Sequence, residues 1–247
     1  MNPHHRARAL VLLAAVSLVA AACGGDEAAP GSTVAPDTVS ILSAAAEAMG
    51  SVDTVRFSIE RGGAPVFIDI GAALGDLLEF KAAEGRFAKP DSADALVTVN
   101  AGGFNTQVGA LAVDGRIWLS FLGSDWQPAP PSYQFDPASL FDPDQGFRQL
   151  FIDGLDDVSL LGEEERDGIA TYHIRGAAGE ERVEVITASL VKDQGVDLDA
   201  WIDRKTGRLV DAFFTTQVND GTATWTLTFR DYGADVAIEA PDLEAGG

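Results

Sequence analysis

Apolar and polar residues alternate along much of the chain between residues 55 and 230. In residues 55–60, Val55, Phe57 and Ile59 alternate with polar residues, a period of two that is typical of a strand with one buried face. Similar segments follow at hairpin spacing, so the pattern predicts about ten antiparallel strands. The later segments are 66–70, 80–89, 95–100, 104–113, 116–120, 169–175, 196–202, 209–218, 222–230 and 236–238.

Short turn sequences join several of these segments. Asp114-Gly115 lies between two alternating runs, and Asn219-Asp220-Gly221 lies between two others. An Asp-Gly pair in this position is a strong hairpin signal. Residues 72–80 fit either a short helix or a strand.

Four segments interrupt the alternation and predict helices. Asp37 and Thr38 offer capping oxygens to an Ala-rich segment, residues 39–49, whose apolar residues recur at helical spacing. Asp before Pro at residues 136–137 places a capping oxygen ahead of a residue with a preset φ. The three later helical segments are 136–141, 144–154 and 180–191.

Together these elements predict the fold class α+β. Long antiparallel strands at hairpin spacing form one strongly curved sheet, and the apolar face of that sheet must be covered. The helices are the natural cover. Residues 37–247 are expected to form a single domain, because β-rich domains often exceed 200 residues without division.

The first 36 residues have a different composition. A cationic stretch ending at Arg8 precedes an apolar run, Ala9–Ala22, which is shorter than the roughly 20 residues that span a bilayer. Residues 1–22 are therefore predicted to be a signal peptide. Residues 23–36 contain two prolines and mostly small or polar residues, which predicts a flexible linker.

Cys23 is the only cysteine of the chain and follows Ala20, Ala21 and Ala22. This order resembles the lipobox of bacterial lipoproteins, in which the thiol receives a diacylglyceryl group and the cleaved chain begins at the cysteine. One departure is Ala20, where Leu is commoner. Two or three acyl chains on Cys23 would anchor the protein stably to the outer face of the cell membrane. The alternative is a leftover thiol beside an ordinary cleavage site.

The chain is strongly acidic, with 17 Lys and Arg against 38 Asp and Glu and a net charge of −21. Removal of residues 1–22 takes away two arginines and no acid, which leaves a net charge of −23. Nucleic acid is excluded as a partner because its phosphates would be repelled. Docking on anionic lipid through a basic patch is disfavoured for the same reason.

No constellation of catalytic residues is visible in the sequence. His173 is the sole histidine after residue 22 and is expected at the surface or rim, and the chain contains no Gly-x-Ser-x-Gly elbow. Metal-ligand spacings are also missing, and carboxylates such as Glu163–Glu165 form surface runs. The sequence therefore predicts a protein that is not an enzyme and has no metal or cofactor.

Several collinear segments, covering residues 38 to 242, resemble the mycobacterial LppX/LprA/LprF/LprG (LppX_LprAFG) lipoprotein family. The most distinctive is Phe135-Asp136-Pro137-Ala138-Ser139-Leu140-Phe141-Asp142-Pro143-Asp144-Gln145-Gly146-Phe147. The others are Ser51–Phe57 after the Ala-rich helix, Ala88-Lys89-Pro90, Val113–Trp118 with Trp126 beyond, Ala200–Asp203 and Phe229–Gly233. The region from Val66 to Phe80 departs from the family by being longer and more apolar.

The resemblance implies a LolA/LppX-like half-barrel sheet, with helices layered on its concave face and an apolar cavity between them. Such a cavity would hold acyl chains of envelope lipids or glycolipids, which family members move outward from the cytoplasmic membrane. Partners would then be these lipids, the membrane through Cys23, and a membrane transporter. Candidate lining residues are Phe57, Ile59, Val66, Ile68, Phe80, Val97, Val99, Val108, Ile117, Leu119, Leu140, Phe147, Leu150 and Phe151.

Two other functions remain open at this point. The chain could be a protein-interaction or envelope-assembly lipoprotein without a lipid cargo, in which the same apolar residues are plain core. It could also be a hydrolase with His173 as a base, which would need a nucleophile nearby. A cavity of several hundred Å³ would favour lipid binding over both.

Overall fold

The computed structural model describes residues 36–68, 78–121, 123–130, 136–219 and 221–242. The chain divides into residues 1–35 and a compact unit of residues 36–247, to which every described residue belongs. The main hydrophobic core extends from Ile41 to Phe229. The described part of residues 36–247, called the domain below, thus contains this core.

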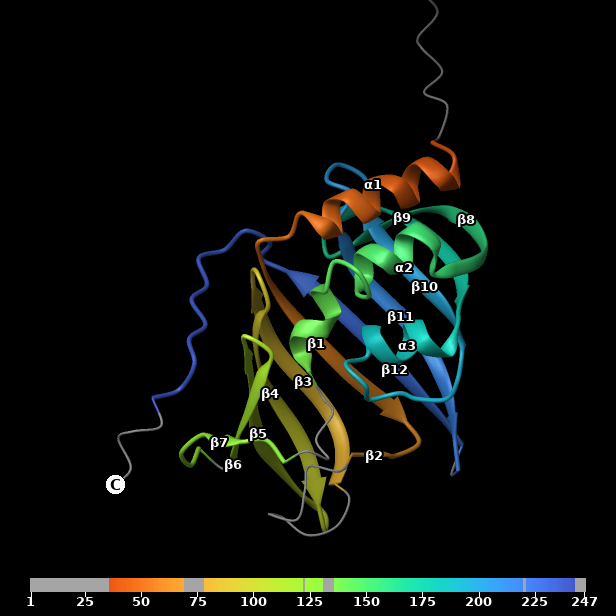
Figure 1. The fold of residues 1–247 in the computed structure, drawn as a ribbon. Coiled ribbons are helices and arrows are strands. Elements are labelled where there is room, and N and C mark those ends of the chain that lie inside the picture. Colours follow the sequence, from red (N-terminus) through yellow and green to blue (C-terminus); the bar gives the residue numbers. More distant parts are fainter. Residues whose placement is uncertain (1–35, 69–77, 122, 131–135, 220, 243–247) are drawn as a thin grey trace, which may run out of the picture. The chain divides into compact units, whose positions relative to one another are not determined.

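One antiparallel sheet of 12 strands dominates the described chain (Figure 1). Its strand order is β7-β6-β5-β4-β3-β1-β12-β11-β10-β9-β8, with β2 paired to β3. Within the described ranges β7 and β8 are not paired with each other, so the sheet is open. The strands are β1 (Thr54–Gly63), β2 (Val66–Ile68), β3 (Leu78–Ala88), β4 (Ser92–Ala101), β5 (Phe104–Val113), β6 (Arg116–Phe121), β7 (Gln127–Pro128), β8 (Leu155–Arg166), β9 (Ile169–Ala178), β10 (Val196–Asp203), β11 (Leu209–Val218) and β12 (Gly221–Arg230).

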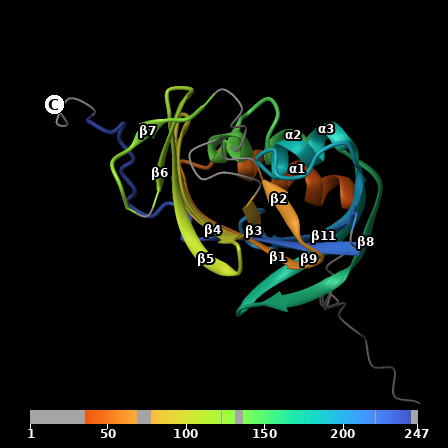
Figure 2. The ribbon, with the colours of Figure 1, turned by 90° about the horizontal axis from the view of Figure 1, so that it is seen from below.

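Four helical segments lie on the concave side of the sheet, as seen from below in Figure 2. Asp37 Oδ1 caps the first by accepting a hydrogen bond from Ser40 N at 2.8 Å, and Asp136 Oδ1 caps the second by accepting one from Ala138 N at 2.9 Å. The segments are α1 (Thr38–Gly50), the 3₁₀-helix η2 (Pro137–Phe141), α2 (Phe147–Asp153) and α3 (Glu180–Ile186). The predicted α+β half-barrel with helices on its concave face is confirmed.

The alternation in the sequence corresponds to the two faces of the sheet. Ile59, Ala83, Val97 and Val108 are paired in register across β1, β3, β4 and β5, and all four are buried on the face toward the helices. The residues between them point to the opposite face, called the outer face below. In this part of the sheet, every second residue of a strand therefore points into the core.

Strand β8 was not predicted. Its 12 residues include Asp156, Asp157 and Glu163–Glu165, so no apolar alternation marks it. Within the part of the chain that the structure describes, it forms one edge of the sheet and pairs only with β9, with irregular register between Asp156 and Ser159. Charged residues on an edge strand oppose pairing with other chains, which explains why its composition resembles that of a loop.

Two other predictions differ from the structure: a strand that does not form and a helix that ends early. Residues 236–238 form no strand, because Ile238 packs against Leu111 and Trp118 on the outer face instead of pairing with a neighbour. In Figure 1 the residues after β12 run along the outside of β4 to β6. Helix α3 ends at Ile186, earlier than the predicted residue 191, since Ala188 and Ser189 adopt positive φ.

Candidate functional site

The predicted lining residues all gather in one apolar cluster between the sheet and the helices. Three of them, Val66, Ile68 and Ile117, are half-buried and pack against the cluster. The others have exposed fractions of 4% or less: Phe57, Ile59, Phe80, Val97, Val99, Val108, Leu119, Leu140, Phe147, Leu150 and Phe151. The structure brings these residues together, and their role as the lining of a lipid cavity stays a prediction.

An aromatic group holds η2 and α2 against the sheet. Phe141, which the sequence analysis did not select, lies at its centre, with ring centroids 4.4 Å from Phe87 and 6.1 Å from Phe57 and Phe229. Phe147 packs edge-on against Phe229 at 5.0 Å. Tilted and stacked aromatic pairs of this kind contribute about 0.5–1.5 kcal/mol each beyond their buried area.

A second aromatic group lies on the inner face of β3, β12 and β11. Trp225 stacks between Phe80, at 5.7 Å, and Phe214, at 6.1 Å. Its Nε1 donates a hydrogen bond to Thr216 Oγ1 at 2.9 Å, and both side chains are buried. Trp225 and Phe214 were not selected from the sequence, although both stand at inward positions of alternating segments.

Small side chains cover the inner face of β3, β4 and β5. The ring of Phe57 lies so close to Gly85 that an added Cβ there would come within 2.4 Å of its Cζ. Small residues project little from the sheet, and the ring of Phe57 occupies the room at Gly85. The buried small residues are Ala83, Ala93, Ala95, Ala110 and Ala112.

The outer face of the same strands carries a hollow of about 1180 Å³. It is lined mainly by outward-pointing residues of β12, β1, β3, β4, β5 and β6, together with Trp126. The inward-pointing Phe57, Gly85, Ala95 and Thr106 also border it. Of the predicted lining residues, it includes only Phe57. The hollow thus lies on the opposite side of the sheet from the apolar cluster.

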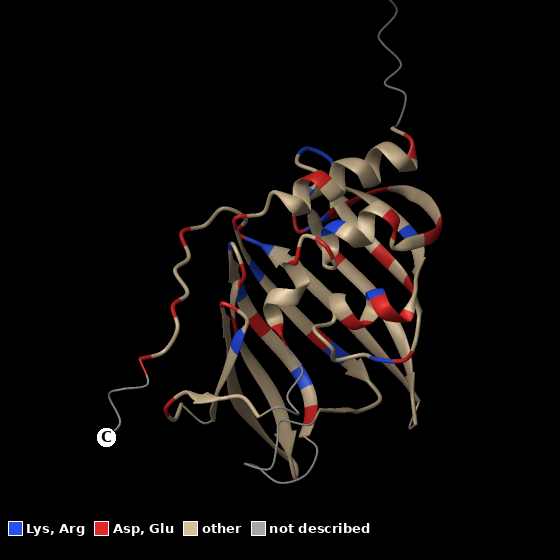
Figure 3. Cartoon of the chain, viewed as in Figure 1, with Lys and Arg blue, Asp and Glu red and all other residues tan. Residues whose placement is uncertain are grey.

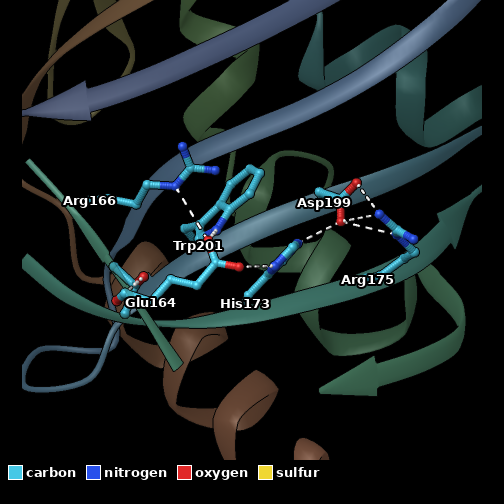
Figure 4. A network of polar contacts seen from close by, with 7 residues as sticks. Glu164, Arg166, His173, Arg175, Asp199 and Trp201 are labelled. Carbon is cyan, nitrogen blue, oxygen red and sulfur yellow. Dashed lines mark hydrogen bonds and ion pairs between the residues drawn. The ribbon is translucent and has the colours of Figure 1, made fainter. Parts of the chain in front are cut away.

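His173 belongs to a polar network on β8, β9 and β10 (Figure 4). Its Nδ1 lies 2.7 Å from Glu164 Oε1, and its Nε2 lies 2.6 Å from Asp199 Oδ1. The imidazole stacks on Trp201 at 4.5 Å, and the guanidinium of Arg166 lies 3.7 Å from the centroid of the same indole. The His173 side chain is 12% exposed and lies on the face of β9 opposite Ile174, as strand alternation predicted, where its partners cover much of it.

The two carboxylates of this network are held in their charged forms. Burial raises the pKa of Asp199, but hydrogen bonds from Arg175 and His173 outweigh it and bring the pKa below its ordinary value. Hydrogen bonds from Trp201 and His173 lower the pKa of Glu164. With no nucleophile among these contacts, the network ties β8, β9 and β10 together and does not resemble a hydrolase site.

We expect Asp199→Asn to lower the free energy of unfolding by about 1.5–3 kcal/mol at pH 7, as for other hydrogen bonds to charged groups. The pKa of Asp199 is lowered on folding, so its stabilisation is present above the unfolded pKa and disappears as the pH falls through the folded one. Urea denaturation of the parent and the variant at pH 7 and pH 3 measures the difference. An equal difference at both pH values would contradict the expectation.

The described residues hold no group of three or more His, Cys, Asp or Glu side chains placed to bind a metal ion. Among the same residues, no helix has the length and apolarity needed to cross a bilayer.

Comparisons with known proteins agree on one family. The model of the LppX_LprAFG lipoproteins matches residues 37–238. The structure of LprF from Mycobacterium bovis is similar at a TM-score of 0.62 and 17% identity, covering 83% of this chain and 96% of that one. Lipoprotein LppX from Mycobacterium tuberculosis is similar at a TM-score of 0.56 and 15% identity, covering 83% of this chain and all of the other. No curated protein matches the chain.

Proposed function

Because the chain belongs to the LppX_LprAFG lipoprotein family, we propose that it binds acyl chains of envelope lipids or glycolipids and carries them outward from the cytoplasmic membrane. The observation that carries the proposal is the apolar cluster between the open sheet and its helices, to which most strands contribute. The acyl chains would lie over the small residues of β3, β4 and β5. Each methylene moved there from water gains roughly 0.8 kcal/mol.

The covering helices are suited to let a lipid enter. Helices α2 and α3 have 7 residues each and η2 has 5. Helices of this length are not stable alone in water, so their order depends on packing against the sheet. A cover made of such segments separates from the sheet in pieces, at less cost than one long helix.

A buried hydroxyl supports a ligand on the inner face. Thr106 is paired with Val99 and lies two residues before Val108, both of which are buried toward the helices. Its Oγ1 is buried and has no hydrogen-bond partner among the described residues. An unpaired buried hydroxyl costs about 1–3 kcal/mol, which a polar group of a bound lipid would recover.

Native mass spectrometry tests the proposal directly. The domain, purified from a bacterial host, is expected to carry lipid mass that organic extraction removes. The extracted domain should then take up 11-(dansylamino)undecanoic acid with a saturable rise in dansyl fluorescence. A domain that carries no lipid and gives no fluorescence rise would overturn the proposal.

We further propose that Cys23 carries the membrane anchor, with residues 24–36 as the tether. The support is the lipobox-like sequence before Cys23 and membership in a lipoprotein family. A linker of about 14 residues has a root-mean-square reach of roughly 20 Å, which keeps the domain near the membrane that supplies its lipid. Cys23→Ser is expected to abolish incorporation of labelled palmitate by cells that express the full chain. Unchanged labelling would show that another residue is modified.

A further inference from the structure

The hollow on the outer face has no role in the proposed lipid site, because the sheet separates the two. It extends across six strands and has a volume of about 1180 Å³. Sites for drug-sized molecules occupy roughly 300–1,000 Å³, so this hollow has room for a ligand of several linked units. We infer that it binds a neutral oligosaccharide.

The charges around the hollow are balanced. Arg86 forms two hydrogen bonds with Asp94, one of them from Nε to Oδ1 at 3.1 Å. Arg56 Nε lies 3.4 Å from Asp231 Oδ2. Figure 3 shows the same interspersion of Lys and Arg with Asp and Glu over the described ribbon. A ligand therefore meets donors and acceptors side by side but little net charge, which suits hydroxyl groups that both donate and accept.

One wall of the hollow is an aromatic ring in a fixed position. The indole of Trp126 stands over Gly109, where an added Cβ would lie 3.0 Å from its Cη2. The same indole packs against the small apolar cluster of Leu111, Val113 and Trp118. It is half-buried and offers part of its surface to the hollow. Sugar rings present C–H groups on one face, and these pack favourably against an aromatic ring.

Uncharged polar side chains complete the lining between the ion pairs and Trp126. They are Ser58, Thr98, Asn105, Gln107, Ser120 and Thr228, with Thr106 at the border. Leu96, which is 45% exposed, adds apolar surface among them. Alternation of hydroxyl or amide groups with apolar patches matches the alternation of hydroxyl and C–H groups on a sugar.

Other ligand classes fit the hollow less well. An extended peptide binds by adding a strand to a sheet edge, but the strands beneath the hollow are paired on both sides, apart from β6 with its short partner β7. An acyl chain would leave the many polar groups of the lining without water or partners. A nucleic acid would be repelled by a net charge of −21.

Titration calorimetry of the domain with maltohexaose, cellohexaose and mannohexaose tests the inference. We expect saturable binding of at least one, and a loss of about tenfold or more in affinity for Trp126→Ala, because the ring platform is removed. Gln107→Ala should weaken binding by a smaller factor. Phe104→Ala is the matched control, since Phe104 is 80% exposed and does not line the hollow.

Far-UV circular dichroism shows whether each variant folds. Trp126→Leu, which keeps apolar volume but removes the aromatic ring, replaces the alanine variant if that one does not fold. The inference is overturned if none of the three sugars binds, or if a folded Trp126 variant and the Phe104 variant bind equally well. Uptake of the dansyl fatty acid is measured on the same samples. Normal uptake without sugar binding overturns this inference and leaves the proposed lipid function untouched.

Discussion

The free energy of unfolding of the domain is expected to fall by about 3–5 kcal/mol when Trp225 is replaced by alanine. Trp225 is fully buried in β12, near the middle of the strand order, and stacks between Phe80 and Phe214. Alanine would leave a cavity between these rings and remove the hydrogen bond to Thr216 Oγ1. Urea denaturation followed by far-UV circular dichroism measures the loss without depending on tryptophan fluorescence.

Two control variants separate the contributions to this loss. Trp225→Phe keeps most of the stacked ring but leaves the Thr216 hydroxyl unpaired, so we expect a smaller loss of about 1–3 kcal/mol. Phe104→Ala removes an aromatic side chain that is 80% exposed and should change stability by no more than about 0.5 kcal/mol. If Trp225→Ala were as mild as Phe104→Ala, Trp225 would not be part of a tightly packed core.

Val97→Trp is expected to reduce uptake of the dansyl fatty acid by more than tenfold. Val97 is 3% exposed and points toward the helices from β4, in register with Ala83 and Val108. An indole at this position would occupy the volume that the proposed acyl chain needs. The measurement is the saturable dansyl fluorescence of the extracted domain.

The neighbouring residue provides the matched control. Leu96 is 45% exposed and points to the outer face, so Leu96→Trp adds the same ring on the other side of the sheet and should leave uptake unchanged. Overpacking of a filled core costs about 1–3 kcal/mol, so thermal unfolding of both variants is measured as well. Val97→Phe replaces the tryptophan variant if that one fails to fold. Normal uptake by a folded Val97 variant would show that the lipid does not lie over β4.

The strands with one buried face were predictable because burial acts on every second residue of such a strand. Val55 to Ile59 show this period directly, and β1 follows it. Strands β5 and β6 have runs of consecutive buried residues instead, because Leu111, Val113 and Trp118 are also buried on the outer face. Strand β8 was missed because at the edge of the sheet it has little apolar surface to bury and shows no clear alternation. Asp167-Gly168, which joins it to β9, is a hairpin signal that the sequence analysis did not use.

The candidate lining residues were predictable as a set, and they do meet in one cluster. Phe141 and Trp225 were missed because their importance comes from rings that are distant in sequence. Phe141 stacks on Phe87, and Trp225 stacks on Phe80. The partners of His173 were also missed, since only the pairing of β8, β9 and β10 brings Glu164 and Asp199 to its two ring nitrogens.

The sequence by itself determined the α+β class, with a curved antiparallel sheet, covering helices and an apolar interior, because hydrophobic periodicity and turn residues are local properties; the half-barrel was implied by the family resemblance. The expectations for Cys23 and its linker also come from the sequence alone. Only the tertiary structure decided which residues share the space beneath the helices, and only it revealed the hollow on the outer face. That hollow is built from residues of six strands and a tryptophan on a connecting segment. No local pattern marks such a set, because its members become neighbours only through the register of the folded sheet.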